Sequence, residues 1–389
     1  MFRIRTYNRI APRGLQQFDP EHYSVSEDMA DPHAYILRSH KLHDEPVPES
    51  LLAVARAGAG YNNIPVDALT HRGIVVFNTP GGNANAVKEL VAAGLFLSSR
   101  DIFGGMSFVH SLRDEQDAAE LSRRLEREKK RFAGTEVAGK TLGVIGLGAI
   151  GSMVANMALE LGMRVLGYDP ALSVEAAWRL SSRVERMEGL NALLGGADYL
   201  SLHVPANDKT RHLIDAEALG RMKRGAVLLN FAREEIVDTR ALLAALDEGQ
   251  LSRYVTDFPL PELFARQDTI LLPHIGASTQ EAEENCAVMA AQQLKDFLAN
   301  GNIVNSVNFP QTRMARNGGY RITFCNDNVP RVLGAVLGVL ADRDINVIDM
   351  VNKSQGDTAY NIIDMATEPD DSVIRDIRAA DGVIRVRAL

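Results

Sequence analysis

The stretch "TLGVIGLGAIGSMVANMALELGMRVLGYD", residues 141–169, decides the fold. A β-rich run leads into three glycines with the spacing G-x-G-x-x-G, and an apolar-periodic helix follows that ends near Gly162. A second β-rich run ends at Asp169, 18 residues after the last glycine of the motif, Gly151. Strand, glycine turn, helix, strand and terminal acid together form the context that a dinucleotide-binding fingerprint requires.

Each position of this motif has a physical role. The first glycine allows a tight turn, the second lets the backbone approach a pyrophosphate, and the third lets the helix pack on its strand. Free N–H groups and the positive helix end then suit an anion. We expect the pyrophosphate to contact the backbone of Gly146, Gly148, Ala149, Ile150 and Gly151. Asp169 can accept hydrogen bonds from ribose hydroxyls and would repel a 2′-phosphate, which favours NAD over NADP. The alternative is a glycine-rich turn without a ligand.

The regions around this motif predict three structural parts. From residue 141 to about 275, β-rich runs alternate with helix-like segments, which predicts a parallel sheet with helices on both faces. Residues 1–92 show a looser version of the pattern, and the charged stretch 113–131 favours a solvated helix. Residues 320–389 follow the order βαββαβ, typical of a ferredoxin-like module.

The expected fold class is therefore α/β, with two Rossmann-like doubly wound parallel-sheet domains and a C-terminal ferredoxin-like module. We predict a substrate-binding domain over 1–93 and 276–308 and a cofactor domain over 94–275. The remaining segments are a linker over 309–319, within the Gly- and Asn-rich stretch 301–319, and the module over 320–389.

Composition narrows the possible classes of function. The chain has 389 residues, a net charge of −8 and only two cysteines, Cys286 and Cys325, far apart in the sequence. This charge argues against general binding of nucleic acid or anionic membranes, and two distant cysteines fit a reducing cytoplasm. The N-terminus has no apolar signal core, and no apolar run approaches the 18 or so residues of a spanning helix. No metal site is expected.

Six segments in order resemble the D-isomer-specific 2-hydroxyacid dehydrogenases. They are "ARAGAGYNNI" (55–64), "NTPGGNANAVKEL" (78–90), "GKTLGVIGLGAIG" (139–151), "SLHVPANDKTRHLID" (201–215), "LLNFAREEIVD" (229–238) and "LLPHIGAST" (271–279). The resemblance covers nearly the whole chain. It implies an NAD-dependent enzyme that passes hydride from C2 of a 2-hydroxy acid to the nicotinamide.

The resemblance also implies catalytic roles. Arg233 matches the family's substrate-binding arginine, whose guanidinium fork suits a carboxylate and the neighbouring oxygen. His274 matches the catalytic histidine, which takes or gives the hydroxyl proton. Glu262 is the candidate acid that orients this histidine. However, the chain reads Asp257-Phe258-Pro259-Leu260-Pro261-Glu262 where the family commonly reads D-V-F-x-x-E-P, and two prolines reshape the loop.

Further residues follow from the same resemblance. Near the cofactor we expect His203, Val204, Pro205, Thr210, Phe231, Ala232, Arg233, Asp257 and His274. The basic loop "LRSHKL" resembles the one that holds the substrate phosphate in members acting on 3-phosphoglycerate. Substrate contacts are therefore expected from Arg38, Ser39, Lys41, Arg56, Gly58, Ala59, Gly60, Arg233 and His274, with Lys129 and Lys130 as further candidates. The bland alternative is that Arg38 and Lys41 are ordinary surface charges.

The C-terminal module resembles an ACT domain, a small regulatory fold that binds amino acids at paired interfaces. In serine-inhibited members of the family, the effector positions correspond to Asn326, Asn328 and Asn346, whereas the usual glycine after the proline is Arg331. L-serine or another amino acid is thus a possible effector, and a module that only builds the oligomer is the alternative. The family implies a homodimer or homotetramer.

The expected reaction is oxidation of 3-phospho-D-glycerate to 3-phosphohydroxypyruvate, the first step of L-serine biosynthesis. Another 2-hydroxyacid dehydrogenase, such as a glyoxylate or hydroxypyruvate reductase, is the nearest alternative. A non-catalytic NAD-sensing partner protein is the alternative from a different class. The joint presence of Arg233, Glu262 and His274 favours an enzyme.

Overall fold

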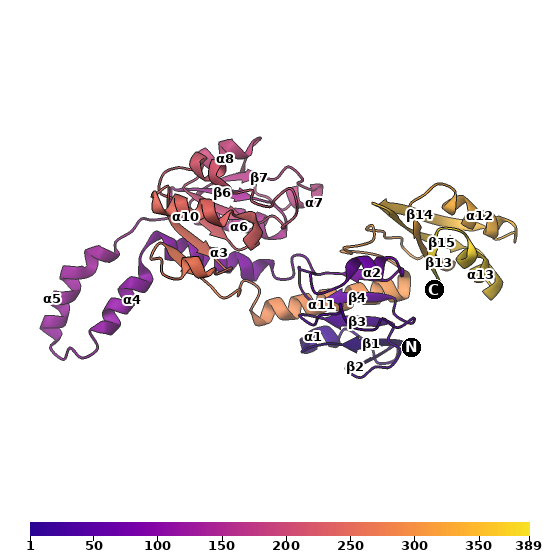
Figure 1. Ribbon diagram of the computed structural model, residues 1–389. Helices are drawn as coiled ribbons and strands as arrows, with labels where there is room; N and C mark the ends of the chain where they lie inside the picture. The colour runs from indigo at the N-terminus through magenta and orange to yellow at the C-terminus, as the bar shows by residue number, and fades with distance from the viewer. The chain divides into compact units, whose positions relative to one another are not determined.

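The computed structural model describes residues 1–389 apart from the side chain of Glu175, and it divides into two compact units. Unit 1 is Met1–Asn83 with Thr279–Leu389, and unit 2 is Ala84–Ser278 (Figure 1). The first break lies at the start of helix α3, ten residues before the predicted boundary at 93/94. The predicted four-part division stays a prediction.

Unit 1 is built on a parallel five-stranded sheet with the order β2-β1-β3-β4-β5. Its strands are β1 (Phe2–Thr6), β2 (Tyr23–Ser26), β3 (Ala34–Leu37), β4 (Ala53–Arg56) and β5 (Val75–Phe77), and its short helices are α1 (Pro12–Leu15) and α2 (Val66–Thr70). The order reverses between β1 and β3, so the carboxyl ends of β1, β3 and β4 form the edge where ligands bind in open α/β sheets.

A long helix, α11 (Gln280–Asn300), packs on this sheet. Thr279 caps its first turn by accepting a hydrogen bond from the Ala282 N–H at 3.2 Å, and Gly301 ends it in the left-handed region with φ 72°. Buried side chains recur at helical spacing, and those of Cys286, Ala290 and Leu294 join the core of the sheet.

The C-terminal module has the predicted order. It contains β13 (Tyr320–Asp327), α12 (Val332–Ala341), β14 (Val347–Gln355), β15 (Thr358–Met365), α13 (Asp371–Ala379) and β16 (Val383–Ala388). The strands form an antiparallel sheet with the order β14-β15-β13-β16. Three of its side chains, Cys325, Tyr360 and Ile362, belong to the same apolar cluster as the sheet of unit 1. The module is therefore packed on the rest of unit 1.

The Gly- and Asn-rich stretch 301–319, which contains the predicted linker 309–319, is packed within unit 1. Ile303 and Phe309 are fully buried, and the side chain of Asn308 accepts a hydrogen bond from the Val76 N–H at 2.8 Å. The same amide donates to the carbonyl of Ile74 at 2.9 Å. Asn308 thus supplies both a donor and an acceptor to the segment around β5. The stretch 301–319 lacks periodicity, and its sequence therefore did not indicate this packing.

Unit 2 contains seven parallel strands with the order β12-β11-β10-β9-β6-β7-β8. The strands are β6 (Thr141–Ile145), β7 (Arg164–Tyr168), β8 (Glu185–Arg186), β9 (Tyr199–Leu202), β10 (Ala226–Asn230), β11 (Leu251–Thr256) and β12 (Thr269–Leu271). The helices are α3 (Ala84–Ser99), α4 (Ile102–Ser111), α5 (Ala118–Glu128), η1 (Lys129–Phe132), α6 (Ala149–Glu160), α7 (Val174–Ala177), α8 (Leu190–Gly196), α9 (Ala216–Arg221), η2 (Glu234–Ile236), α10 (Thr239–Asp247) and η3 (Pro261–Leu263). Apolar clusters cover both faces of the sheet, so the predicted α/β fold class is confirmed.

The helices α4 and α5 bury no side chain, and the pair extends away from the rest of unit 2 in Figure 1. Asp101 and Asp117 cap their first turns. The solvated helix predicted within 113–131 is thereby confirmed. None of the described helices is both long and apolar enough to cross a membrane.

Candidate active site

The glycine loop joins β6 to α6. Gly146 has φ 87°, a left-handed conformation that suits glycine, and its N–H donates to the carbonyl of Tyr168 at 2.9 Å. A Cβ added at Gly151 would lie 1.8 Å from the carbonyl oxygen of Gly146, so no side chain fits there. The turn can therefore close only with glycine at both positions.

The loop leaves room and donors for an anion. A Cβ added at Gly148 would meet no atom within 4 Å, and no side chain caps the first turn of α6. In contrast, α9 and α10 of the same unit have the capping carboxylates of Asp215 and Asp238. The loop through Ala149 and Ile150 thus fits the pyrophosphate of the predicted NAD.

Asp169 follows β7 and is held beside the loop. One carboxylate oxygen accepts from the Leu147 N–H at 2.8 Å and the other from the Ala171 N–H at 2.9 Å. Each oxygen has a second lone pair, so the carboxylate can still accept hydrogen bonds from ribose hydroxyls. The position agrees with the predicted role of Asp169.

The segment after β9 packs against the glycine turn. The His203 N–H donates to the carbonyl of Ile145 at 2.8 Å, and a Cβ at Gly146 would lie 2.7 Å from the His203 carbonyl. Val204 and Pro205 follow, and the hydroxyl of Thr210 donates to the Pro205 carbonyl at 2.5 Å. Thr210 therefore closes this loop, and its predicted contact with the cofactor stays a prediction.

Burial lowers the pKa of His203 from 6.5 to about 3, and its ring nitrogen lies 2.8 Å from the Ser201 hydroxyl. Below pH 6.5 the unfolded chain binds a proton at this residue, whereas the folded chain does not until about pH 3. Stability should therefore fall with falling pH, by at most about 1.4 kcal/mol per unit from this group. Urea unfolding of unit 2 at pH 7 and pH 5 checks this, because His203→Gln should show a shallower loss than the wild type. An equal loss in both proteins would contradict the assignment.

Arg233 lies three residues after the last residue of β10 and has an extended backbone conformation. Its own carbonyl accepts from the buried side chain of Asn230 at 2.8 Å, which fixes the turn that follows the strand. The guanidinium is exposed, and its one hydrogen bond within the described residues goes to the Ala232 carbonyl at 2.6 Å. Phe231 is buried in the core. The guanidinium is thus available for an anionic ligand.

His274 follows β12 after Pro273 and has φ 55°, which is uncommon for a residue with a side chain. The Asp257 carboxylate holds this backbone by accepting from the N–H groups of Ile275 and Gly276, both at 2.7 Å. Asp257 is 2% exposed, whereas His274 is exposed with its ring beside that of Phe258. Asp257 therefore positions the histidine loop, a role that sequence reasoning missed, and its predicted nicotinamide contact stays a prediction.

Glu262 is not brought to His274 in this structure. It lies exposed in η3, which begins at Pro261, and no hydrogen bond or ion pair joins it to any described residue. The two prolines flanking Leu260 hold this turn, as the departure from the family pattern foreshadowed. The pairing of Glu262 with His274 stays a prediction.

The predicted substrate residues of unit 1 lie at the carboxyl ends of β3 and β4. Arg56 donates through Nε to the Arg38 carbonyl at 3.0 Å, and its guanidinium packs over Gly58, where an added Cβ would lie 2.5 Å from a guanidinium nitrogen. Asn8 accepts from the Ser39 N–H at 3.1 Å, and Lys41 is exposed. The Ala59 carbonyl, beside Gly60, accepts from the Asn78 side chain at 2.6 Å.

One acidic residue enters this site without having been predicted. A carboxylate oxygen of Glu283, on the first turn of α11, lies 2.6 Å from the guanidinium of Arg38. The signal available in the sequence is the acidic run that opens the helix after His274. Nothing in the periodicity shows that one of these acids faces Arg38.

Comparison with known proteins identifies the family of this chain. Residues 106–276 match the family described as the D-isomer specific 2-hydroxyacid dehydrogenase, NAD binding domain. The D-3-phosphoglycerate dehydrogenase of Escherichia coli K12 is 32% identical over 381 residues, which cover 94% of this chain and 88% of that protein. The chain belongs to the D-isomer-specific 2-hydroxyacid dehydrogenase family.

Within this 2-hydroxyacid dehydrogenase family the matches include several D-3-phosphoglycerate dehydrogenases. That of Methanocaldococcus jannaschii is 35% identical over 312 residues, 78% of this chain, which spans 56% of the archaeal protein. A crystal structure of NAD⁺-bound 3-phosphoglycerate dehydrogenase from Entamoeba histolytica aligns with a TM-score of 0.61 and 26% identity, covering 79% of this chain and 98% of that one. The predicted family and the predicted cofactor class are confirmed.

Two of the three predicted effector side chains, those of Asn326 and Asn328, form hydrogen bonds within the module. The buried Asn326 side chain donates to the Asp327 carbonyl at 2.7 Å and accepts from Asn361 at 2.8 Å. Asn328 donates to the Gly356 carbonyl at 3.0 Å, while Asn346 is exposed. Arg331 precedes α12 with φ 79°. An ACT-type serine site stays a prediction.

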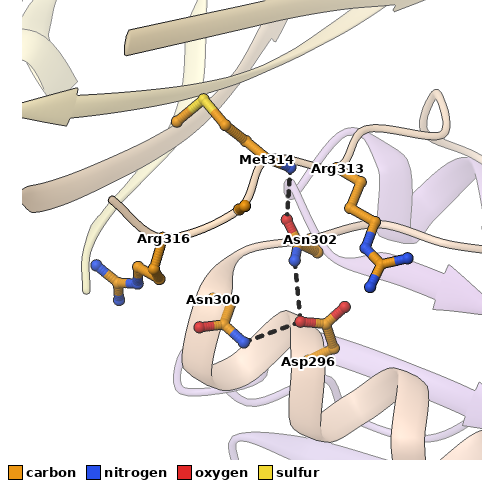
Figure 2. A pocket seen from close by; sticks show the side chains of 7 residues that line it. Asp296, Asn300, Asn302, Arg313, Met314 and Arg316 are labelled. Carbon is orange, nitrogen blue, oxygen red and sulfur yellow. Dashed lines mark hydrogen bonds between the residues drawn. The ribbon is translucent and has the colours of Figure 1, made fainter. Parts of the chain in front are cut away.

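A hollow of about 640 Å³ in unit 1 is lined by none of the predicted site residues (Figure 2). The end of α11 and the segment 313–316 line it. Figure 2 shows Asp296 accepting hydrogen bonds from Asn300 at 2.9 Å and Asn302 at 3.0 Å. The Asp296 carboxylate is therefore engaged in hydrogen bonds. The residues that line the hollow include no candidate for hydride or proton transfer among those predicted.

Proposed function

We propose that this protein oxidises 3-phospho-D-glycerate to 3-phosphohydroxypyruvate with NAD, which is the first step of L-serine biosynthesis. The observation that carries the proposal is the similarity to D-3-phosphoglycerate dehydrogenases across 88% of the length of the E. coli protein. The glycine loop, Arg233 and His274 at the carboxyl ends of β6, β10 and β12 support it.

In this proposal NAD, when bound, would supply the acceptor for the hydride that leaves C2 of the substrate. The loop from Gly146 to Gly151 and the start of α6 hold the pyrophosphate, and Asp169 holds the ribose. Arg233 binds the substrate carboxylate through its guanidinium fork. His274 takes the proton of the C2 hydroxyl as general base, and returns it to the carbonyl oxygen in the reverse direction.

We propose Glu262 as the acid that orients His274, because the other acids between 257 and 274 are engaged. The Asp257 carboxylate accepts hydrogen bonds from the backbone after His274. Asp268 forms a bidentate ion pair with Arg266 at 2.8 and 2.7 Å. Glu262 alone in this segment has no partner among the described residues.

Comparing substrates tests the proposed function. The ratio kcat/KM, followed by NADH oxidation, should be at least about tenfold higher for 3-phosphohydroxypyruvate than for hydroxypyruvate, because the phosphate adds charge-assisted bonds. Arg38→Ala should lower the ratio for the phosphorylated substrate alone. A preference for hydroxypyruvate or glyoxylate would instead assign the protein as a reductase of those acids.

The alternative of a non-catalytic NAD-sensing protein is tested in the same assay. Calorimetric binding of NADH without turnover of any 2-oxo acid would favour it. The exposed Arg233 and His274, and the clamp that Asp257 forms beside His274, support an enzyme instead.

We also propose a cytoplasmic homo-oligomer. Ile102, Phe103, Met106 and Val109 on α4 are large apolar side chains left exposed in the single chain. Apolar faces of this kind are typical of protein interfaces. Both cysteines are buried and unpaired, which is compatible with a reducing compartment. We further propose that the oligomer is a dimer or a tetramer and that the protein binds an amino-acid effector.

A further inference from the structure

The first turn of α11 places a row of acids beside the substrate residues of unit 1. The helix carries Glu281, Glu283 and Glu284 in its opening residues, where negative side chains interact favourably with the helix dipole. Close packing holds this turn in place: a Cβ added at Gly82 would lie 2.7 Å from the sulfur of Cys286. The position of the turn relative to β3 and β4 is therefore fixed by the core.

Two of these acids, Glu283 and Glu284, have different partners. A carboxylate oxygen of Glu283 lies 2.6 Å from an Arg38 guanidinium nitrogen, with 44% and 37% of the two side chains exposed. Glu284 instead pairs with Arg13 at 3.3 Å and accepts from Gln280 at 2.9 Å. Glu283 is thus the counter-ion of Arg38 within the described residues.

The pair sits among the other groups of the predicted phosphate site. Arg56 donates to the Arg38 carbonyl, so the two arginines leave adjacent strands side by side. Both arginines, together with Glu283, act electrostatically on Cys286, whose pKa is raised mainly by its burial. Two cations and one carboxylate therefore gather around the start of α11.

We propose that Glu283 is a displaceable counter-ion of Arg38 that sets the KM for the phosphorylated substrate. This inference rests on the proposed function, because it needs the substrate phosphate to bind Arg38. The substrate phosphate and the Glu283 carboxylate compete for the guanidinium of Arg38. The phosphate binds more strongly because it has a higher charge and three acceptor oxygens. Glu283 then swings into solvent or repels the phosphate, and either event weakens binding.

An unphosphorylated 2-oxo acid leaves the pair intact. Its single carboxylate is assigned to Arg233, so it gains nothing from Arg38. Glu283 therefore acts on one class of substrate, and it is a specificity-determining residue that acts through Arg38.

Glu283→Gln tests the proposal, because the amide keeps the shape of the side chain and removes its charge. The KM for 3-phosphohydroxypyruvate should fall by about two- to fivefold, as expected for loss of a half-exposed competing ion pair. The value of kcat, and the KM for hydroxypyruvate, should stay within about twofold of the wild type.

Glu284→Gln is the matched control. It changes the charge of the same helix turn equally, but its carboxylate belongs to Arg13, so the KM values should not move. In the Arg38→Ala background, Glu283→Gln should have no further effect on KM. An unchanged or raised KM in Glu283→Gln, or an equal shift in Glu284→Gln, overturns the inference.

A binding measurement distinguishes failure of the proposed function from failure of the proposed role of Glu283. Calorimetric titration of 3-phosphoglycerate into the NADH-bound protein should show tighter binding to Glu283→Gln than to the wild type. Tighter binding without turnover of the phosphorylated substrate overturns the proposed function and supports the role of Glu283. Turnover by the wild type with equal binding by both proteins overturns the role of Glu283 alone.

Discussion

Replacing His274 with Asn is expected to lower kcat by about 10²- to 10⁴-fold, the usual contribution of a positioned general acid or base. Asn tolerates the left-handed backbone that His274 adopts, with φ 55°, so the Asp257 clamp on the following N–H groups should survive. Steady-state NADH oxidation measures kcat, and fluorescence titration should show that NADH still binds.

His212→Asn is the control for this change. His212 belongs to the same unit and also has a left-handed backbone, with φ 51°, but it lies in the turn before α9 near Asp238, not at the end of a strand. Its replacement should leave kcat within about twofold, since surface changes away from a site have small effects. If His274→Asn retained kcat within fivefold of the wild type, proton transfer would have to be assigned elsewhere.

The centre of the fold could be predicted because its signals are local. In the stretch 141–169 the strand, the glycine turn, the helix and Asp169 follow from residue types at fixed spacing, and β6, α6 and β7 lie where expected. The module was predictable for the same reason, since its four strands and two helices each carry their own periodicity. The short strands β1, β2 and β8 lack such a pattern and were not predicted.

What could not be predicted depends on contacts between distant residues. The clamp of Asp257 on Ile275 and Gly276 spans 18 and 19 positions, and the pair of Arg38 with Glu283 spans far more. Residues 301–319 look like a linker in the sequence because they are rich in polar residues and lack periodicity. In the structure these polar groups are used: the Asn308 amide, for example, forms hydrogen bonds with the backbone near β5. Composition shows that a polar group is present but not which partner it will have.

The C-terminal module and the segment 309–319 before it are joined to α11 by arginines that donate to its last carbonyl groups. Arg387 donates to the carbonyls of Phe297 and Leu298, Arg316 to Ala299, and Arg321 to Asn300, at 3.4, 3.0, 3.1 and 2.9 Å. The Phe297 carbonyl also accepts from the Gly301 N–H at 2.9 Å, the carbonyls of Leu298, Ala299 and Asn300 lie beyond the last helical bond, and cations suit the negative end of the helix dipole. Arg321 is fully buried, and its charge is balanced by the fully buried Asp364, with bonds of 2.6 and 2.7 Å.

Asp364→Ala should therefore destabilise unit 1 by about 3–5 kcal/mol, because it leaves the Arg321 charge buried without its counter-ion. The remaining acceptors are the carbonyls of Asn300, Met314 and Ala315, which supply hydrogen bonds but no negative charge. Urea unfolding measures the loss. Hydrogen exchange should locate it in β13 and at the end of α11.

Two further variants separate loss of the buried pair from loss of any ion pair. Asp376→Ala removes the exposed partner of Arg343 in the same module and should cost less than about 1 kcal/mol. The double change Arg321→Met with Asp364→Leu replaces both charges by apolar groups, and should recover most of the stability lost in Asp364→Ala, since buried pairs often exchange for apolar packing at little cost. A loss in Asp364→Ala no larger than in Asp376→Ala would show that the module is not held to α11 through Arg321. Failure of the double variant to recover would instead mean that the bonds from Arg321 to the carbonyls hold the helix end, whatever charge lies behind them.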